Sequence, residues 1–301
     1  MAWTCIGFAN EFAQSHSCNG IYMGIEQMEG EGYEWSGLAL QLTAPCSYYK
    51  TGDVIYLGSG DTNITQIATH AHLSAGKSYT VGFEEACAEP QPMKECATES
   101  YTHITQITPM GKNSEDFIPQ GYTLFAKTEG DLTHDGIKDT ILMLKATDPK
   151  GIILDDNQQK LDRNRRGIVI LHKTKDGYLL ASENDGCFSS ENEDGGVYYP
   201  PELDIKIQNQ KLVISYSHGR YGNWEYTFRY QDFDYVLIGY DASDAMGDQQ
   251  TSINFLTHKR VDKTNTTPDA NSPHFEEKWS TINQTGLLKL SEIKDFDTLS
   301  F

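Results

Sequence analysis

Short runs of alternating or β-branched apolar residues, separated by turns that contain glycine, recur along the whole chain of 301 residues. Runs of this length and spacing are typical of β-strands. They are residues 34–42, 53–57, 62–69, 77–83, 121–126, 140–145, 167–172, 178–181, 203–207, 211–216, 223–230 and 234–240. Because helix signals are scarce, we predict a mainly β protein with little helix.

Tight connections between neighbouring runs predict hairpins. Asn209–Lys211 and Gln231–Phe233 each separate two such runs by a few residues, which favours an antiparallel meander. The strongest helix signal is Phe275–Trp279, which follows a candidate N-cap at Ser272 and then a proline, and a second covers 286–293. No fixed period recurs, so a solenoid or a complete multi-blade propeller is not expected.

A shift in charge divides the chain near residue 110. Residues 1–110 hold three basic and twelve acidic residues and no arginine, whereas the remainder mixes both signs. Glycine and proline between Pro109 and Pro119 interrupt regular structure at the same place. We therefore predict a cysteine-containing β domain over 1–110, folded as a small disulfide-linked sandwich or barrel. A larger antiparallel β-meander domain is predicted over 111–301.

Five of the six cysteines lie within the first 96 residues, which is the pattern of disulfides in a small domain. The candidates are Cys5, Cys18, Cys46, Cys87 and Cys96. Cys187 is expected to pair across the domains or to stay free, and the alternative is six reduced, buried thiols. Disulfides imply an oxidising compartment, so we expect a periplasmic or extracellular protein. The first residues lack a signal-peptide pattern, so we expect that a signal was removed, and no apolar run predicts a membrane span.

Residues 130–139 form a loop with oxygen-bearing side chains at alternating positions, directly before an apolar strand. Asp131, Thr133, Asp135 and Asp139 occupy loop positions 1, 3, 5 and 9, glycine stands at position 6, and the carbonyl of Ile137 falls at position 7. Hard oxygen ligands at this spacing favour calcium. The alternative is a hairpin turn rich in aspartate and glycine that binds no metal.

This loop resembles the calcium loop of the FG-GAP repeats found in integrin α-chain propellers and related bacterial repeats, in which a glycine–aspartate pair begins a run of alternating acidic or amide residues before a strand. The match covers only this loop. It departs at Thr133, where the family usually has Asn or Asp, and at His134, where a small residue is common. The resemblance implies a structural calcium site on a β scaffold and does not imply an enzyme.

Two further stretches are candidates for contact with a partner. An acidic run without any basic residue contains Glu183, Asp185, Glu191, Glu193 and Asp194, and its alternative is a solvated loop. A turn region rich in polar and aromatic groups contains His218, Arg220, Tyr221 and Trp224, and its alternative is ordinary aromatic packing across strands. The basic cluster at residues 161–167 is expected to pair with nearby acidic side chains, or else to anchor a partner that carries carboxylates.

The net charge is −19, from 24 basic and 43 acidic residues, and such a charge repels nucleic acids and anionic membranes. We therefore expect a non-catalytic acidic binding protein with a protein partner, such as a basic toxin, that the acidic surface attracts. The charge and architecture are similar to those of bacterial envelope proteins that capture a partner, including immunity proteins. Two alternatives stay open: a hydrolase acting on carbohydrate or peptidoglycan, which needs two carboxylates close together in an aromatic cleft, and an extracellular adhesion module.

Overall fold

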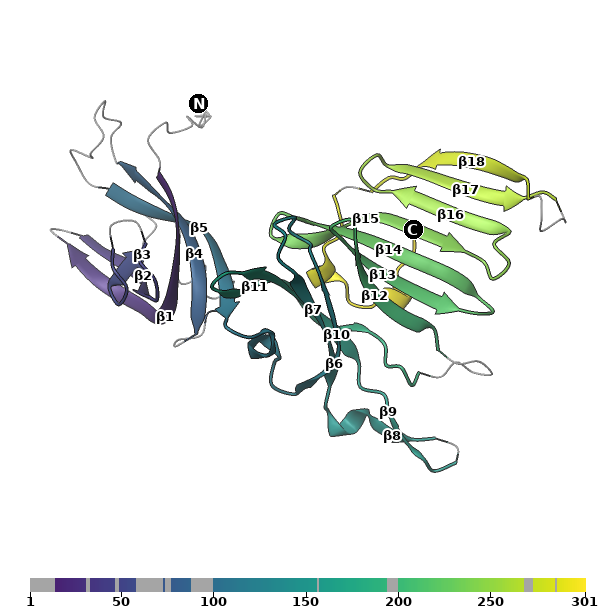
Figure 1. Cartoon of the computed structure of the whole chain (residues 1–301), viewed down its shortest axis with the longest axis horizontal. Coiled ribbons are helices and arrows are strands. Elements are labelled where there is room, and N and C mark those ends of the chain that lie inside the picture. Colours follow the sequence, from purple (N-terminus) through teal and green to yellow (C-terminus); the bar gives the residue numbers. More distant parts are fainter. Residues whose placement is uncertain are drawn as a thin grey trace. The chain divides into compact units, whose positions relative to one another are not determined.

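The computed structural model describes residues 14–30, 33–46, 49–57, 73, 77–87, 100–155, 157–193, 200–267, 273–284 and 286–301. The chain divides into two compact units, Met1–Gly111 and Lys112–Phe301, each with its own hydrophobic core. The described elements are strands and short 3₁₀ turns, so the prediction of a mainly β, antiparallel protein is confirmed (Figure 1). None of the described elements is a helix with the length and apolar composition needed to cross a membrane.

The described residues of the first unit form five antiparallel strands in the order β3-β2-β1-β4-β5. They are β1 (Gln14–Gly30), β2 (Tyr33–Leu42), β3 (Val54–Leu57), β4 (Ser78–Cys87) and β5 (Ser100–Gly111). Apolar residues at every second position, such as Leu38 and Leu40 of β2 and Val81 and Phe83 of β4, are buried on one face. The outer strands β3 and β5 also approach each other, so the sheet curls.

Among the described cysteines, a disulfide joins Cys18 of β1 to Cys46, which follows β2. Cys187 is a free, buried thiol in the second unit, and burial raises the pKa of this thiol. The side chains of Cys5, Cys87 and Cys96 lie outside the described part of the chain, as does the predicted strand at 62–69.

The second unit is built from two antiparallel sheets that share one core. The first contains β6 (Tyr122–Gly130), β7 (Asp139–Ala146), β10 (Arg166–Thr174) and β11 (Gly177–Phe188), in the order β11-β10-β7-β6. A small hairpin, β8 (Ile152–Leu154) with β9 (Lys160–Asp162), lies between β7 and β10 in the sequence. The short 3₁₀ turns in the described part of this unit are η1 (Ser114–Phe117), η2 (Pro149–Gly151), η3 (Leu290–Glu292) and η4 (Phe296–Thr298).

The second sheet is a seven-stranded meander in which every strand pairs with the next one in the sequence (Figure 1). Its strands are β12 (Glu202–Gln208), β13 (Lys211–His218), β14 (Gly222–Gln231), β15 (Asp234–Ser243), β16 (Gln249–Asn254), β17 (Lys259–Asn265) and β18 (Phe275–Thr281). The hairpins expected at Asn209 and Asp232 are present, and the residues of both turns have positive φ, as two-residue hairpin loops require.

Strands β7 and β10 are buried on both faces, which explains why their sequences are continuous apolar runs rather than alternating ones. Ile141 and Met143 face the core shared with the meander. Leu142 and Leu144, on the opposite face, pack with Val169 and with a layer of side chains that includes Phe117 and Ile118 near η1.

The two helix predictions are wrong. Residues 275–279 belong to β18, because Trp279 lies opposite Val261 of β17 and the chain continues the meander as one more strand. At 286–293 only the 3₁₀ turn η3 forms. In both segments, backbone pairing or packing onto the sandwich prevails over a weak local preference for helix.

We expect removal of the disulfide to destabilise the first unit. Closing a loop between residues 28 apart in the sequence restricts the unfolded chain, so the double variant Cys18→Ser/Cys46→Ser should lower the free energy of unfolding of this unit by about 3.5 kcal/mol. Hydrogen exchange followed by mass spectrometry of the full chain measures this as faster exchange in β1, β2 and β4. Peptides from the meander serve as the internal control, and equal protection of the first unit in both proteins would contradict the prediction.

Candidate functional site

A pocket of about 520 Å³ lies at one end of the second unit, where aromatic side chains of the meander meet two other segments of the chain. The meander contributes His218, Tyr221, Trp224, Tyr226 and Tyr240. The segment after β11 and the residues before β12 contribute Ser189, Glu193, Pro200 and Pro201, and the C-terminal segment contributes Phe296, Asp297 and Leu299. Apolar walls with a few polar groups are typical of ligand pockets.

The alternation of β14 places Trp224 and Tyr226 on the same face of the meander. The ring of Trp224 stacks on Tyr216 of β13 with the ring centres 5.4 Å apart. Tyr226 lies 5.2 Å from the ring of Tyr240, its partner across the strands, and 5.1 Å from Phe296. These contacts hold the aromatic walls in fixed positions.

A tight turn between β13 and β14 places His218 and Tyr221 at the pocket. The backbone amide of Tyr221 donates a hydrogen bond to the His218 carbonyl at 2.8 Å, and the two rings lie 4.6 Å apart. Gly222 follows with a φ of +99°, and a Cβ there would lie 2.0 Å from the Ser243 carbonyl oxygen, so only glycine fits. His218 is buried, whereas Tyr221 is 63% exposed at the tip.

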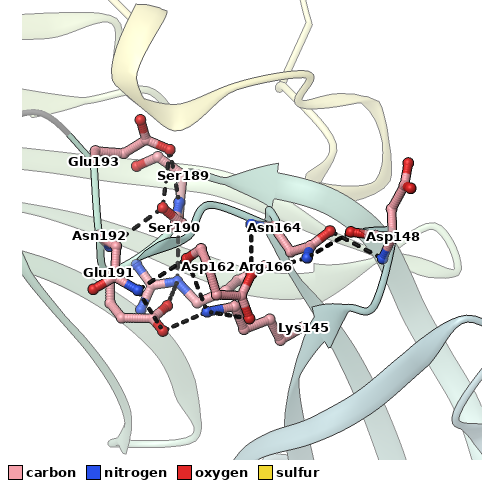
Figure 2. Close-up of polar contacts among 10 residues, drawn as sticks. All are labelled: Lys145, Asp148, Asp162, Asn164, Arg166, Ser189, Ser190, Glu191, Asn192 and Glu193. Carbon is pink, nitrogen blue, oxygen red and sulfur yellow. Dashed lines mark hydrogen bonds and ion pairs between the residues drawn. The ribbon is translucent and has the colours of Figure 1, made fainter. Parts of the chain in front are cut away.

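An ionic network of two buried cations and two partly exposed carboxylates fixes the segment that forms the second wall (Figure 2). Lys145 of β7 lies 3.2 Å from the carboxylate of Asp162 and also forms an ion pair with Glu191. Arg166 of β10 donates through Nε to the Ser189 carbonyl at 2.8 Å, and the same nitrogen is 3.9 Å from Glu191 Oε2. Lys145 and Arg166 are only 6% and 5% exposed, so these charges depend on their partners.

Hydrogen bonds continue from this network to the pocket itself. Asn192 Nδ2 donates to the carbonyl of Asp162 at 2.9 Å, and Glu193 Oε1 accepts from the amide and hydroxyl of Ser190 at 3.2 and 3.1 Å (Figure 2). The segment that carries Ser189 and Glu193 is therefore held against β10 and the end of β9.

Arg166 is also within electrostatic reach of the pocket carboxylates. Burial lowers the pKa of Arg166, and the nearby groups Glu191, Tyr216, Asp297 and Glu193 oppose this shift. The hydroxyl of Tyr216, buried beside this group, has no hydrogen-bond partner among the described residues, and burial raises its pKa.

The pocket gathers four of the predicted partner-binding residues, Glu193, His218, Tyr221 and Trp224, from stretches far apart in the sequence. The other predicted residues lie elsewhere. Glu191 belongs to the ionic network, Asp185 pairs with Tyr122, and Glu183 is on β11 opposite Val169. Arg220 lies in the turn without lining the pocket, and Asp194 is outside the described residues.

Sequence reasoning missed Tyr226, Tyr240, Phe296 and Asp297. The first two could have been found from the alternation of β14 and β15. No local sequence pattern indicated Phe296 and Asp297, because the position of the C-terminal segment depends on tertiary packing.

The basic cluster forms internal pairs, but mainly with acidic residues distant in sequence. Arg166 lies beside Glu191, and Arg165 forms an ion pair with Asp295 at 3.2 Å. Asp162 from within the cluster pairs with Lys145.

In the loop of residues 130–139, the aspartates accept hydrogen bonds from backbone amides. Asp139 is fully buried. Its Oδ2 accepts hydrogen bonds from the backbone amides of Leu132 and Thr133 at 2.7 and 3.0 Å, and its Oδ1 accepts one from the backbone amide of Lys173 at 2.8 Å. Asp131 accepts from His134 and Gly136, and Asp135 accepts from Ile137. No three His, Cys, Asp or Glu side chains converge on a metal position in the described part of the chain, which includes this whole loop. Calcium binding here stays a prediction.

A second hollow, of about 590 Å³, lies over β12 to β17 of the meander. Register places Asp204, Ser215, Glu225, Asp241 and Ser252 in one row across the sheet, on the face opposite Tyr216 and Tyr226. Glu225 and Asp241 are directly opposite each other. Burial and the charge of Asp241 raise the pKa of Glu225, and Lys206 partly offsets this.

No family model fits the sequence, and no curated protein is significantly similar to it.

Loss of Glu191 should destabilise the second unit. In Glu191→Ala, Lys145 stays buried with Asp162 as its remaining ion-pair partner and Arg166 loses a nearby carboxylate, so we expect the free energy of unfolding to fall by about 2–3 kcal/mol. Asp204→Ala, which removes the exposed pair with Lys206, is the matched control and should cost under about 0.5 kcal/mol. Urea denaturation measures both. Equal stability of the two variants would show that the network contributes nothing.

Two variants distinguish a calcium-binding role of the 130–139 loop from a role in backbone hydrogen bonding alone. Asp139→Ala leaves three backbone amides without their acceptor and should lower the unfolding free energy by about 2–4 kcal/mol even in chelator. Asp135→Ala removes one exposed acceptor, so in chelator it should cost under about 1 kcal/mol. If calcium binds, wild-type protein gains thermal stability with added calcium and Asp135→Ala does not. No calcium-dependent change in the wild-type melting temperature would end the calcium proposal.

Proposed function

We propose that the protein is a non-catalytic binding protein that captures a basic protein partner, such as a toxin, in the manner of an immunity protein. The observation that carries this proposal is the pocket at the end of the second unit, which combines aromatic walls with the carboxylates of Glu193 and Asp297. Tyrosine and tryptophan in a fixed pocket are the residues that supply most binding energy at protein interfaces.

The charge of the chain supports the same function. A net charge of −19 attracts a positively charged protein over a distance of several ångströms and accelerates its association. The disulfide between Cys18 and Cys46 is compatible with an oxidising compartment, and we propose the periplasm or the cell exterior as the location. In this proposal the 130–139 loop, with or without calcium, serves the scaffold and not the ligand.

Binding kinetics test the capture proposal. The full-length protein is used to isolate a basic partner from envelope extracts, and the association rate is then measured at increasing salt. We expect the rate to fall by about tenfold or more between 50 and 500 mM salt, because steering between opposite charges is screened. Tyr221→Ala should speed dissociation, whereas Trp279→Ala, at an equally exposed position on β18, should not. An association rate independent of salt contradicts capture by charge.

A second candidate function rests on the row of residues in the hollow over β12 to β17. The opposition of Glu225 and Asp241 fits the carboxylate pair of a glycoside hydrolase, in which one protonated carboxyl group donates to the leaving oxygen and one ionised group acts on the other side of the bond. The raised pKa of Glu225 suits it to the role of acid.

Activity assays on a panel of oligosaccharides and peptidoglycan fragments test this candidate. Glu225→Gln and Asp241→Asn should each abolish hydrolysis, and Asp232→Asn, in the exposed turn between β14 and β15, should retain it. The wild-type rate should decline as pH rises through the pKa of Glu225, because the acid must be protonated. Absence of hydrolysis over the whole panel, or equal activity in all three variants, would remove the candidate.

A further inference from the structure

The carboxylates grouped around the pocket at the end of the second unit outnumber the two buried cations of the ionic network beside it. Two buried cations, Lys145 and Arg166, lie among four carboxylates, those of Asp162, Glu191, Glu193 and Asp297. Asp162 and Glu191 are ion-paired, whereas the pocket carboxylates Glu193 and Asp297 form no ion pair with a described residue and have Arg166 only as a neighbouring charge. A further positive group at the pocket would balance part of this charge.

The two pocket carboxylates also retain free hydrogen-bonding capacity. Both bonds from Ser190 to Glu193 end on Oε1, and none of the described donors bonds to the carboxylate of Asp297. Asp297 is held in place because its amide donates to Asp295 Oδ1 at 3.0 Å and because its neighbour Phe296 is buried. Both carboxylates can therefore accept hydrogen bonds from a ligand in the pocket.

The aromatic walls favour a cation for a separate reason. The faces of tryptophan and tyrosine rings carry partial negative charge and attract an ammonium or guanidinium group placed over them. Trp224, Tyr226 and Tyr240 all line the pocket. Trp224 packs on Tyr216, and Tyr226 packs on Phe296 and Tyr240, which limits the motion of these rings. The aromatic rings and the carboxylates therefore both favour a positively charged ligand.

We propose that this pocket receives an arginine side chain of the partner protein, an inference that rests on the proposed capture function. A guanidinium group is flat, stacks on an aromatic face and donates two parallel hydrogen bonds to one carboxylate, whereas a lysine ammonium is a compact, strongly hydrated charge. The volume of about 520 Å³ also leaves room for the arginine stem and adjoining groups of the partner. The partner therefore presents an arginine at the centre of its contact surface.

Nuclear magnetic resonance of the full chain with ¹⁵N-labelled tryptophan tests this assignment. The probes are N-acetyl-arginine amide and N-acetyl-citrulline amide, which has nearly the same shape and no charge. The indole signal of Trp224, assigned with Trp224→Phe, should shift saturably with the arginine probe and need about tenfold more of the citrulline probe. The signal of Trp279 should not move, because its ring is on the opposite face of the sheet, at the edge strand.

Variants complete the test. Asp297→Asn and Glu193→Gln should each weaken binding of the arginine probe by about fivefold or more, and Asp204→Asn should leave it unchanged. Equal binding of the two probes, or undiminished binding in both pocket variants, overturns the assignment.

The capture proposal and the arginine assignment can fail separately. If a basic partner binds with a salt-dependent rate while the arginine probe does not reach Trp224, the arginine assignment is wrong and capture stands. If the arginine probe binds as predicted but association of the partner is independent of salt, capture by charge is wrong and the pocket assignment stands.

Discussion

Phe296 packs against both sheets of the second unit, and the position of the candidate site depends on this contact. Its ring stacks on Phe188 of β11 at 5.0 Å and meets the edges of Tyr226 and Phe228 of β14 at 5.1 and 6.2 Å. Because Phe296 is almost completely buried, the C-terminal segment is tied to the end of the sandwich. Asp297 and Leu299 reach the pocket for this reason.

The site also depends on how the charged ends of β7 and β10, two strands buried on both faces, are neutralised. Strands covered on both sides leave little place for charge, yet the buried cations Lys145 and Arg166 lie directly opposite each other at the end of this strand pair. Their charges are offset by Glu191 and Asp162, and this holds the segment that carries Ser189 and Glu193. Buried ion pairs in general add little stability beyond what well-packed apolar residues would provide. The structural effect of this network is that it holds one wall of the pocket in place.

The parts of the fold set by local pattern were predictable from the sequence. The alternation in β13 to β15 and the polar turns at Asn209 and Asp232 predicted the meander, and the continuous apolar runs of β7 and β10 were recognisable as strands. Strand β18 was not recognisable, since residues 275–279 become a strand only by pairing with β17. Whether a weakly amphipathic segment at the edge of a sheet forms a strand depends on the strand with which it pairs, and the local sequence does not show that strand.

The candidate site was predictable only in part. The crowding of His218, Tyr221 and Trp224 in one turn pointed to this end of the meander, whereas Phe296 and Asp297 arrive from the far end of the chain through core packing. The acidic residues between 183 and 194 look alike in the sequence but differ in their contacts. Glu191 neutralises Lys145, whereas Glu193 faces the pocket. Composition reveals the charge of such a segment, and tertiary contacts decide which of its charges remain available to a ligand.

A crystal structure of the full chain in complex with N-acetyl-arginine amide would show directly whether the pocket takes an arginine side chain. We expect the guanidinium group in the pocket, over an aromatic ring and hydrogen-bonded to Asp297 or Glu193. A guanidinium group bound instead between Glu225 and Asp241 on the other face of the meander, with the aromatic pocket occupied only by solvent, would contradict this expectation.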